Sequence, residues 1–204
     1  MNRFEEALAG VLGMERLEKI QRVRIGIAGA GGLGSNCASY LVRSGFKKFR
    51  IVDFDLVETG NLNRQFFFSD QVGRLKVEAL AENLRRINPD LELEMLTLEI
   101  GEENAGEIFA GCAVVVEALD RPRFKKLLVE KYIDSDKLVV AVSGMAGWGR
   151  TGEFTVRRLK NNFYLVGDLV SEASPEWPPL APGAAAAAAM QADVILTHIL
   201  GQKP

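Results

Sequence analysis

A short apolar strand that runs into a glycine-rich turn is the feature that most constrains this chain. Residues 23–34 read Val-Arg-Ile-Gly-Ile-Ala-Gly-Ala-Gly-Gly-Leu-Gly, and the turn has the spacing Gly29-x-Gly31-x-x-Gly34. Glycines let the backbone turn tightly and let phosphate oxygens approach its amides. A helix that starts near Leu33 would direct its unpaired N–H groups and the positive end of its dipole at that anion. The segment therefore predicts a nucleotide-phosphate site, without saying which nucleotide.

Apolar periodicity predicts alternating strands and helices after an N-terminal helical segment, residues 1–22. The expected strands are Val23–Ala28, Phe49–Asp53, Leu91–Ile100 near the sheet edge, Ala113–Glu117 and Leu138–Val142. The expected helices are Leu33–Ser44, one that begins after Gly73 and reaches about Ile87, a short one at Glu103–Phe109, and Arg123–Tyr132. This β-α-β-α rhythm predicts an α/β fold with a Rossmann-like, doubly wound and mostly parallel sheet.

The pattern changes after Gly144. Shorter strands at Gly152–Arg157 and Phe163–Val166 suggest an antiparallel C-terminal extension, and the proline-containing stretch Ser171–Pro182 is expected to be a loop. A run of alanines then leads into a terminal helix at Met190–Leu200, because alanine has the highest helix propensity. With no flexible linker or internal repeat, we expect one domain over residues 1–204.

Charge and cysteine content exclude several classes of protein. The net charge is −2, so no basic field favours nucleic acid as a partner. No signal peptide is evident, and no uninterrupted apolar run is long enough to cross a bilayer, so we expect no membrane association. With only two cysteines, Cys37 and Cys112, a cytoplasmic location is the simplest expectation.

The polar residues after the second strand narrow the choice of nucleotide. The glycine pattern alone fits NAD, FAD, S-adenosylmethionine or ATP, and Asp53 at the end of that strand suits a ribose hydroxyl in several of them. Further polar and charged residues follow it in the chain: Asp55, Asn61, Arg64, Gln65, Lys76 and Asp120. An enzyme that cleaves ATP at its α-phosphate needs cations on the departing pyrophosphate and a carboxylate for Mg²⁺, whereas a dehydrogenase leaves its pyrophosphate intact.

As a set, these motifs resemble the E1-like superfamily of ATP-dependent activating enzymes, which includes ThiF and MoeB. The motifs are Gly29-Ala-Gly-Gly-Leu-Gly34, Val52-Asp-Phe-Asp55, Asn61-x-x-Arg64-Gln65, Val72-Gly73-x-x-Lys76 and Asp120. The resemblance covers about residues 20–145. The strongest resemblance is to short ThiF-type sulfur carrier protein adenylyltransferases, and this resemblance extends to Ser143–Gly147 and Val166–Asp168.

The resemblance implies that ATP and the C-terminal Gly-Gly carboxylate of a ThiS- or MoaD-like ubiquitin-fold carrier give an acyl-adenylate and pyrophosphate. It implies that Asp53 binds the ribose and that Asp120 binds Mg²⁺. Asn61, Arg64 and Lys76 would bind the triphosphate, and Arg64, Lys76 and Asp120 would be the catalytic residues. The other implied nucleotide-binding residues are Gly29, Gly31, Gly32, Gly34, Asp55 and Gln65. A homodimer is also implied.

The chain departs from the family pattern in three respects. It has no Cys-x-x-Cys pair, so we expect no structural zinc of that type. Neither cysteine falls where a sulfur-handling cysteine would, so we expect both in the core and expect sulfur transfer to be left to another protein. The Arg-Tyr-x-Arg-Gln segment of many relatives is missing, and Arg3, Arg16 and Arg22 remain unassigned substitutes for its arginine.

Three alternatives stay open from the residues alone. The glycine turn and Asp53 permit an NAD-dependent oxidoreductase, although no hydride-transfer acid or base is evident. A non-catalytic nucleotide-binding subunit of an activating complex is the second. The third keeps the same chemistry with a tRNA base as acceptor. The only histidine, His198, is expected to be a packed or surface residue of the last helix, and the role of Asp168 is undecided.

Overall fold

A seven-stranded sheet organises the molecule in the computed structural model, which describes residues 1–201. Its strands are β1 (Arg24–Ala28), β2 (Lys48–Val52), β3 (Glu92–Leu96), β4 (Val114–Glu117), β5 (Leu138–Val142), β6 (Thr155–Lys160) and β7 (Phe163–Gly167). They lie in the order β3-β2-β1-β4-β5-β7-β6, and every neighbouring pair is parallel except β6 and β7. The predicted doubly wound, mostly parallel α/β sheet is confirmed.

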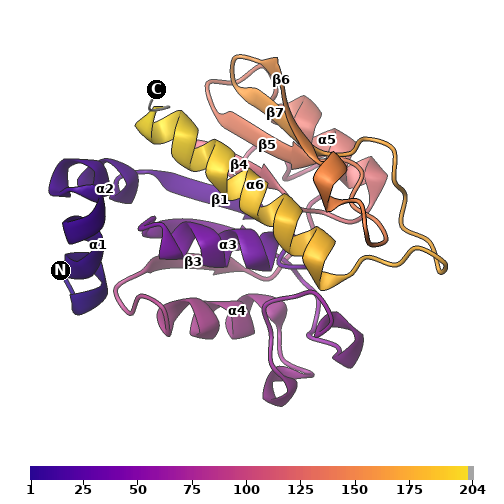
Figure 1. Cartoon of the computed structure of the whole chain (residues 1–204), viewed down its shortest axis with the longest axis horizontal. Coiled ribbons are helices and arrows are strands. Elements are labelled where there is room, and N and C mark those ends of the chain that lie inside the picture. The colour runs from indigo at the N-terminus through magenta and orange to yellow at the C-terminus, as the bar shows by residue number, and fades with distance from the viewer. Residues whose placement is uncertain (202–204) are drawn as a thin grey trace.

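Helices cover both faces of this sheet (Figure 1). They are α1 (Arg3–Leu12), α2 (Met14–Gln21), α3 (Gly34–Arg43), α4 (Lys76–Arg85), α5 (Pro122–Tyr132) and α6 (Ala181–Leu200). Figure 1 shows α3, α4 and α6 on the near face and α5 behind the sheet. Short 3₁₀ turns occur at Thr59–Asn61, Ser69–Gln71 and Thr151–Glu153.

The central strands are buried on both faces. In β4, Val114 and Val116 belong to the core under α3 and α6, and Val115 between them belongs to a second core under α5. This alternation follows from the period of two along a strand. It explains why β4 and β5 are continuous runs of apolar residues rather than alternating ones.

The strand order contains one reversal, and that reversal positions the site. From β1 the chain adds β2 and then β3 on one side, after which β4 pairs with the other edge of β1. Ligands of open α/β sheets bind beside such a switch point, at the carboxyl ends of the strands. The loops after β1 and β4 therefore meet at the expected ligand position.

Two helix predictions need correction. The N-terminal segment is two helices, because Gly13 interrupts it with φ +83°. The predicted helix at Glu103–Phe109 is wrong: the chain makes a series of turns there. The Asn104 side chain accepts from the Gly101 amide and donates to the Glu99 carbonyl, so it competes with helical bonding of the backbone.

Other boundaries differ by a few residues. β3 is shorter than the predicted Leu91–Ile100, although it is an edge strand as expected. The C-terminal extension is only partly antiparallel, since β7 pairs parallel with β5 and β6 alone runs the opposite way. A 3₁₀ turn precedes β6, where the predicted strand began at Gly152. The last helix begins at Ala181, so it includes the whole alanine run.

Helix α6 is long and apolar enough to span a membrane by length and composition, with a mean hydropathy of 1.3 over the scored window. Its packing identifies it as a core helix, because Ala187, Ala188 and Ile195 belong to the main core. Its buried Gln191 also donates to the carbonyls of Glu117 (3.1 Å) and Val140 (3.2 Å), which fixes the helix to the sheet. The small alanine side chains let it approach α3 closely.

Candidate active site

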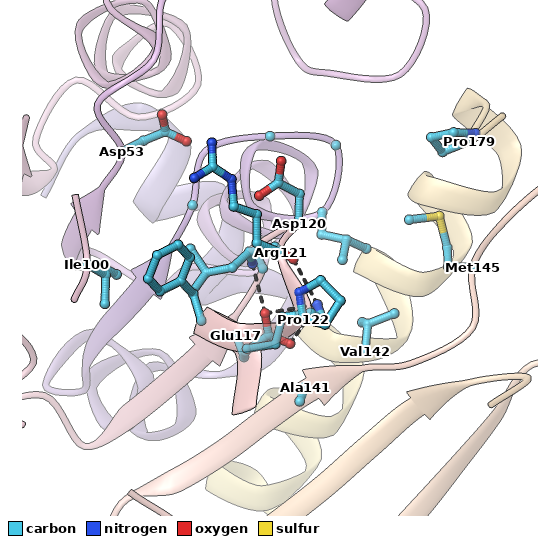
Figure 2. A pocket seen from close by; sticks show the side chains of 18 of the residues that line it. Asp53, Ile100, Glu117, Asp120, Arg121, Pro122, Ala141, Val142, Met145 and Pro179 are labelled. Carbon is cyan, nitrogen blue, oxygen red and sulfur yellow. Dashed lines mark hydrogen bonds and ion pairs between the residues drawn. The ribbon is translucent and has the colours of Figure 1, made fainter. Parts of the chain in front are cut away.

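A cavity of about 820 Å³ opens at the carboxyl ends of the parallel strands. Loops after β1, β2, β3, β4 and β5 line it, together with the segment that leads into α6. Figure 2 shows Asp53 and Ile100 on one side of it, Met145 and Pro179 on the other, and Asp120 between them. The volume is in the range of small-molecule and cofactor sites.

The glycine turn forms one wall of this cavity. Gly29 has φ +96°, and a Cβ at this position would lie 2.6 Å from the Ala118 carbonyl oxygen at the end of β4. A side chain at Gly34 would collide with the Gly29 carbonyl, so Gly34 lets α3 pack against the turn. No side chain among the described residues caps the N-terminus of α3. The Ser35 amide donates to the Gly31 carbonyl at 3.0 Å, so the amides that can face an anion are those of the turn before Ser35.

Asp53 holds the glycine turn in place from the end of β2. Its Oδ2 accepts from the Ala30 amide at 2.6 Å, and its Oδ1 accepts from the Asp55 amide at 2.8 Å. Burial raises the pKa of the Asp53 carboxyl, against the lowering effect of these amides and of Lys76. The carboxylate therefore both fixes the loop and faces the cavity, where a ribose hydroxyl could donate to it.

Lys76 is a buried cation at the start of α4. Its Nζ lies 2.6 Å from Asp55 Oδ2, and its amide donates to the Asp55 carbonyl at 2.9 Å. An isolated bridge between Leu56 and Leu75 brings the two segments together. The ammonium is buried while its ion-pair partner Asp55 is half-exposed, and Asp53 also interacts with its charge. Lys76 therefore places a positive charge at the cavity lining.

Arg64 is tied to the glycine turn through Asn36. The Asn36 amide donates to the Gly32 carbonyl at 2.7 Å and to the Arg64 carbonyl at 2.8 Å. The Arg64 guanidinium donates to Asn63 Oδ1 at 2.7 Å, which leaves most of its five N–H groups available. Nearby, the Asn61 side chain accepts from the Glu58 amide at 3.0 Å, so its acceptor atom is already in use.

Asp120 follows β4 and is exposed to the cavity. Within residues 1–201 its carboxylate has no hydrogen bond or ion pair. No group of three or more His, Cys, Asp or Glu side chains in that part of the chain is arranged to hold a metal ion. One free carboxylate still fits Mg²⁺, which is commonly held by one or two carboxylates together with substrate phosphates and water.

Sequence reasoning missed a second buried carboxylate, Glu117. It ends β4, is 1% exposed, and lines the cavity floor (Figure 2). Its Oε1 accepts from the Leu119 amide at 2.8 Å and from Lys125 Nζ at 2.9 Å. Burial raises the pKa of the Glu117 carboxyl, although Lys125 and the amide oppose that shift. The sequence feature that could have indicated this buried carboxylate is a charged residue at the end of an otherwise apolar strand.

The structure therefore gathers most of the predicted site. Of the predicted residues, those that line the cavity are Gly29, Gly31, Gly32, Asp53, Asp55, Asn61, Arg64, Gln65, Lys76 and Asp120. Gly34 does not line it and serves the packing of α3 instead.

Three other residues lie outside the cavity lining. Cys37 and Cys112 are free and buried, and burial raises the pKa of both thiols, which suits core residues rather than nucleophiles. His198 packs edge-on against the Tyr164 ring, as expected of a residue in the last helix.

Comparison with known proteins agrees with this geometry. The model of the ThiF family matches residues 4–204. The chain belongs to the ThiF family. Among curated relatives, "Adenylyltransferase and sulfurtransferase UBA4" of Candida glabrata is 36% identical over 157 residues, which is 76% of this chain and 35% of that protein. "Ubiquitin-like modifier-activating enzyme 5" of Oryza sativa subsp. japonica is 41% identical over 98 residues, or 48% of this chain and 23% of that protein. This ThiF-family chain thus spans about a third or less of these relatives.

Solved structures share the fold over nearly the whole chain. The E. coli tRNA N6-threonylcarbamoyladenosine dehydratase TcdA, in complex with ATP, superposes with a TM-score of 0.89 at 21% identity. The match covers 97% of this chain and 94% of TcdA. E. coli MccB, also with ATP, has a TM-score of 0.70 at 20% identity and covers 98% of this chain and 64% of MccB. Both ThiF-like neighbours were solved with the nucleotide that the sequence motifs favour.

Proposed function

We propose that this ThiF-family chain is an ATP-dependent adenylyltransferase that activates the C-terminal Gly-Gly carboxylate of a small ubiquitin-fold sulfur carrier. The observation that carries the proposal is the convergence of Arg64, Lys76 and Asp120 on the glycine turn within one cavity. Two cations and a free carboxylate beside a helix N-terminus suit a triphosphate that is cleaved at its α-phosphate. A nicotinamide cofactor, whose pyrophosphate stays intact, would need few of these groups.

In this reaction an oxygen of the carrier carboxylate attacks the α-phosphorus of ATP. The bond between the α-phosphorus and the oxygen that bridges to the β-phosphate breaks. The carrier is left as an acyl-adenylate, and the β- and γ-phosphates leave as pyrophosphate. The carboxylate is already anionic and needs no general base, which agrees with a cavity lining that contains no histidine among the described residues. The chain's task is therefore to position the two anions and to stabilise charge on the leaving group.

Each side chain has a distinct part in that task. Arg64 offers a planar fork to phosphate oxygens, and Lys76 offers a compact charge for the β- and γ-phosphates. Asp53 is placed for a ribose hydroxyl, and the amides of the turn and of α3 for the phosphates. Asp120 would hold Mg²⁺, which when bound offsets the negative charge of the phosphates.

The decisive test is Mg²⁺-dependent exchange of labelled pyrophosphate into ATP in the presence of a ubiquitin-fold carrier ending in Gly-Gly. Arg64→Ala and Asp120→Ala are each expected to lower the exchange rate by about 100-fold or more, because each removes charge stabilisation from the reacting phosphates. Arg43→Ala and Asp70→Ala are matched controls, since both residues are exposed and lie outside the cavity lining. Exchange that is absent in the wild type, or equal in all five proteins, would contradict the proposal.

A tRNA acceptor is the second candidate, and the likeness to TcdA is the observation that favours it. The chemistry at ATP would be the same, with a carboxylate on a modified base in place of the carrier terminus. The net charge of −2 is the argument against it. Pyrophosphate release with bulk tRNA, but not with carriers, would make this the correct acceptor.

By analogy with ThiF-type enzymes we propose a homodimer, which sedimentation equilibrium can test. The two free, buried cysteines are compatible with a reducing cytoplasm. They also support our proposal that the chain stops at the adenylate and that another protein supplies sulfur.

A further inference from the structure

Two segments without helix or strand form the side of the cavity opposite Asp53. The β5 loop (residues 143–150) contributes Ser143, Gly144, Met145 and Ala146 to the lining. The strap (residues 169–180) contributes Ala173 and Pro179. Figure 1 shows the strap leaving β7, projecting away from the sheet, and returning to the start of α6. None of these lining residues is charged, so this wall differs from the phosphate side of the cavity.

The beginning of the strap is firmly held. Asp168, whose side chain is 2% exposed, accepts from the amides of Val170 (2.9 Å) and Ser171 (2.8 Å). Burial raises the pKa of the Asp168 carboxyl, but hydrogen bonds from Ser171 and Val170, together with the charge of Arg150, outweigh burial and lower the pKa overall. Ser171 Oγ in turn accepts from the Ala146 amide at 3.0 Å. Leu169, which follows Asp168 in the chain, has φ +67°, a left-handed conformation that a leucine rarely adopts. The chain is therefore forced into a fixed, strained exit from β7.

The remainder of the strap is held in a different way. Within the described residues, no hydrogen bond or ion pair joins positions 172–179 to the rest of the chain; the bonds there, such as Trp177 N to Ser174 Oγ at 3.1 Å, are internal. Its contact with the β5 loop is Trp177, whose ring lies 5.0 Å from that of Trp148 at an interplanar angle of 33°. The same ring lies against Gly147, where any side chain would collide with it.

The strap is also stiff. It contains Pro175, Pro178 and Pro179, which restrict its backbone and favour movement as a unit about its two ends. Stacked aromatic rings shift a two-state equilibrium by roughly 2- to 12-fold beyond simple burial, so one pair can hold such a segment without locking it. Both tryptophans remain about half exposed, with 55% and 48% of their surface accessible to solvent.

We propose that Trp148 and Trp177 form a latch that holds the strap against the β5 loop, and that this latch positions the uncharged wall against the incoming acceptor chain. The inference rests on the proposed function, because it assumes an acceptor distinct from ATP. The nucleotide would contact the glycine turn, Arg64 and Lys76 on the other side, so its binding does not require the latch. The two tryptophans are thus positioning residues for the acceptor and not catalytic residues.

Limited proteolysis tests the latch without reference to activity. The strap carries two glutamates, Glu172 and Glu176, which are exposed and are sites for a glutamate-specific protease. Trp148→Ala leaves the strap sequence intact, and we expect cleavage at these sites about 10-fold faster than in the wild type. Trp148→Phe, which keeps an aromatic ring, should restore most of the protection. Phe68→Ala is a matched control, because Phe68 is 46% exposed and lies outside the cavity lining. Equal cleavage rates in all four proteins would overturn the latch.

Kinetics and fluorescence test what the latch positions. With a carrier ending in Gly-Gly, Trp148→Ala should raise the KM for the carrier about fivefold or more and leave the KM for ATP within about twofold. The chain has only two tryptophans, both in the latch, so tryptophan emission excited outside the tyrosine absorption band reports on the latch. Emission should change on addition of the carrier, but not with Mg-ATP, nor with a carrier that lacks its last two glycines.

Two results would overturn the acceptor role: an unchanged KM for the carrier, or a fluorescence response to Mg-ATP equal to the response to the carrier. A wild-type protein that releases no pyrophosphate with any carrier would instead overturn the proposed function. In that case the proteolysis rates still decide whether the latch exists.

Discussion

Glu117 is a charged side chain that the fold buries at considerable cost in solvation. Because burial raises its pKa, the folded protein binds this proton more tightly than the unfolded chain does. Stability must therefore decline as pH rises from the ordinary value of 4.5 to the raised value in the folded state. In Glu117→Gln this decline should be absent, so the variant gains stability relative to the wild type across that window. Lys125 keeps a partner in the variant, since its Nζ also donates to the Leu119 carbonyl at 2.8 Å.

Urea unfolding of both proteins between pH 4.5 and 8 measures this difference. Glu130→Gln is the matched control, because Glu130 is an exposed residue of α5. A difference between Glu117→Gln and the wild type that stays constant with pH would contradict the assignment.

At the residue scale, the site residues that could be predicted are those that belong to a short sequence motif. Asp53, Arg64 and Lys76 each stand at a fixed spacing within a recognisable segment, and the fold brings them into one cavity. The Glu117–Lys125 pair was not predictable in the same way. Glu117 belongs to β4 and Lys125 to α5. Only the packing of α5 on β4 brings Lys125 Nζ to 2.9 Å from the Glu117 carboxylate.

Helix α6 depends on small side chains, and this gives a prediction at the scale of the element. Ala187 is fully buried in the main core, whereas Ala189, two residues later, is exposed. Leucine and alanine have similar helix propensities, so a leucine at either position changes packing far more than helix formation. Ala187→Leu should lower the free energy of unfolding by about 1–3 kcal/mol through overpacking.

Ala189→Leu should change the free energy of unfolding by less than about 0.5 kcal/mol, because surface substitutions are usually tolerated. Thermal or urea unfolding of the two variants beside the wild type provides the comparison. Equal destabilisation by both substitutions would mean that α6 does not pack as described.

Element types were predictable where apolar periodicity is strong, and boundaries were less so. β5 was predicted at its observed limits because its five residues are all apolar and buried. The turns at Glu103–Phe109 were mistaken for a helix because their apolar residues have helical spacing, while the competing side-chain bonds of Asn104 leave no periodic trace. The antiparallel pairing of β6 with β7 was expected, but the parallel pairing of β7 with β5 was not, because a strand pattern does not show which strand lies beside it.

The attachment of α1 to the rest of the molecule gives the prediction at the largest scale. Glu5 is 2% exposed; its Oε1 lies 2.9 Å from Lys47 Nζ and accepts from Asn88 at 3.2 Å. Burial raises the pKa of the Glu5 carboxyl, but Lys47 and Asn88 outweigh burial and lower it overall. The ionised group therefore stabilises the fold above its ordinary pKa of 4.5, and this contribution is lost as pH falls through the lowered pKa.

Glu5→Gln should lower the free energy of unfolding at pH 7 by about 1–3 kcal/mol, because Lys47 loses its charged partner. Glu6→Gln is the control, since Glu6 is an exposed neighbour in the same helix. Chemical denaturation at pH 7 and at pH 3 checks both variants. The deficit of Glu5→Gln should shrink at the lower pH, and a deficit independent of pH would refute the ion pair as its cause.

For the whole molecule, the α/β class, the glycine turn and the set of charged residues around it could be predicted from the order of residues alone. These properties follow from the types of residues and their spacing along the chain, because steric and electrostatic interactions between near neighbours produce them. Three contacts became evident only from the folded structure: Glu117 with Lys125, Glu5 with Lys47, and Trp148 with Trp177. Each of these contacts joins different elements, so it exists only once the sheet order and the helix packing have brought the elements together.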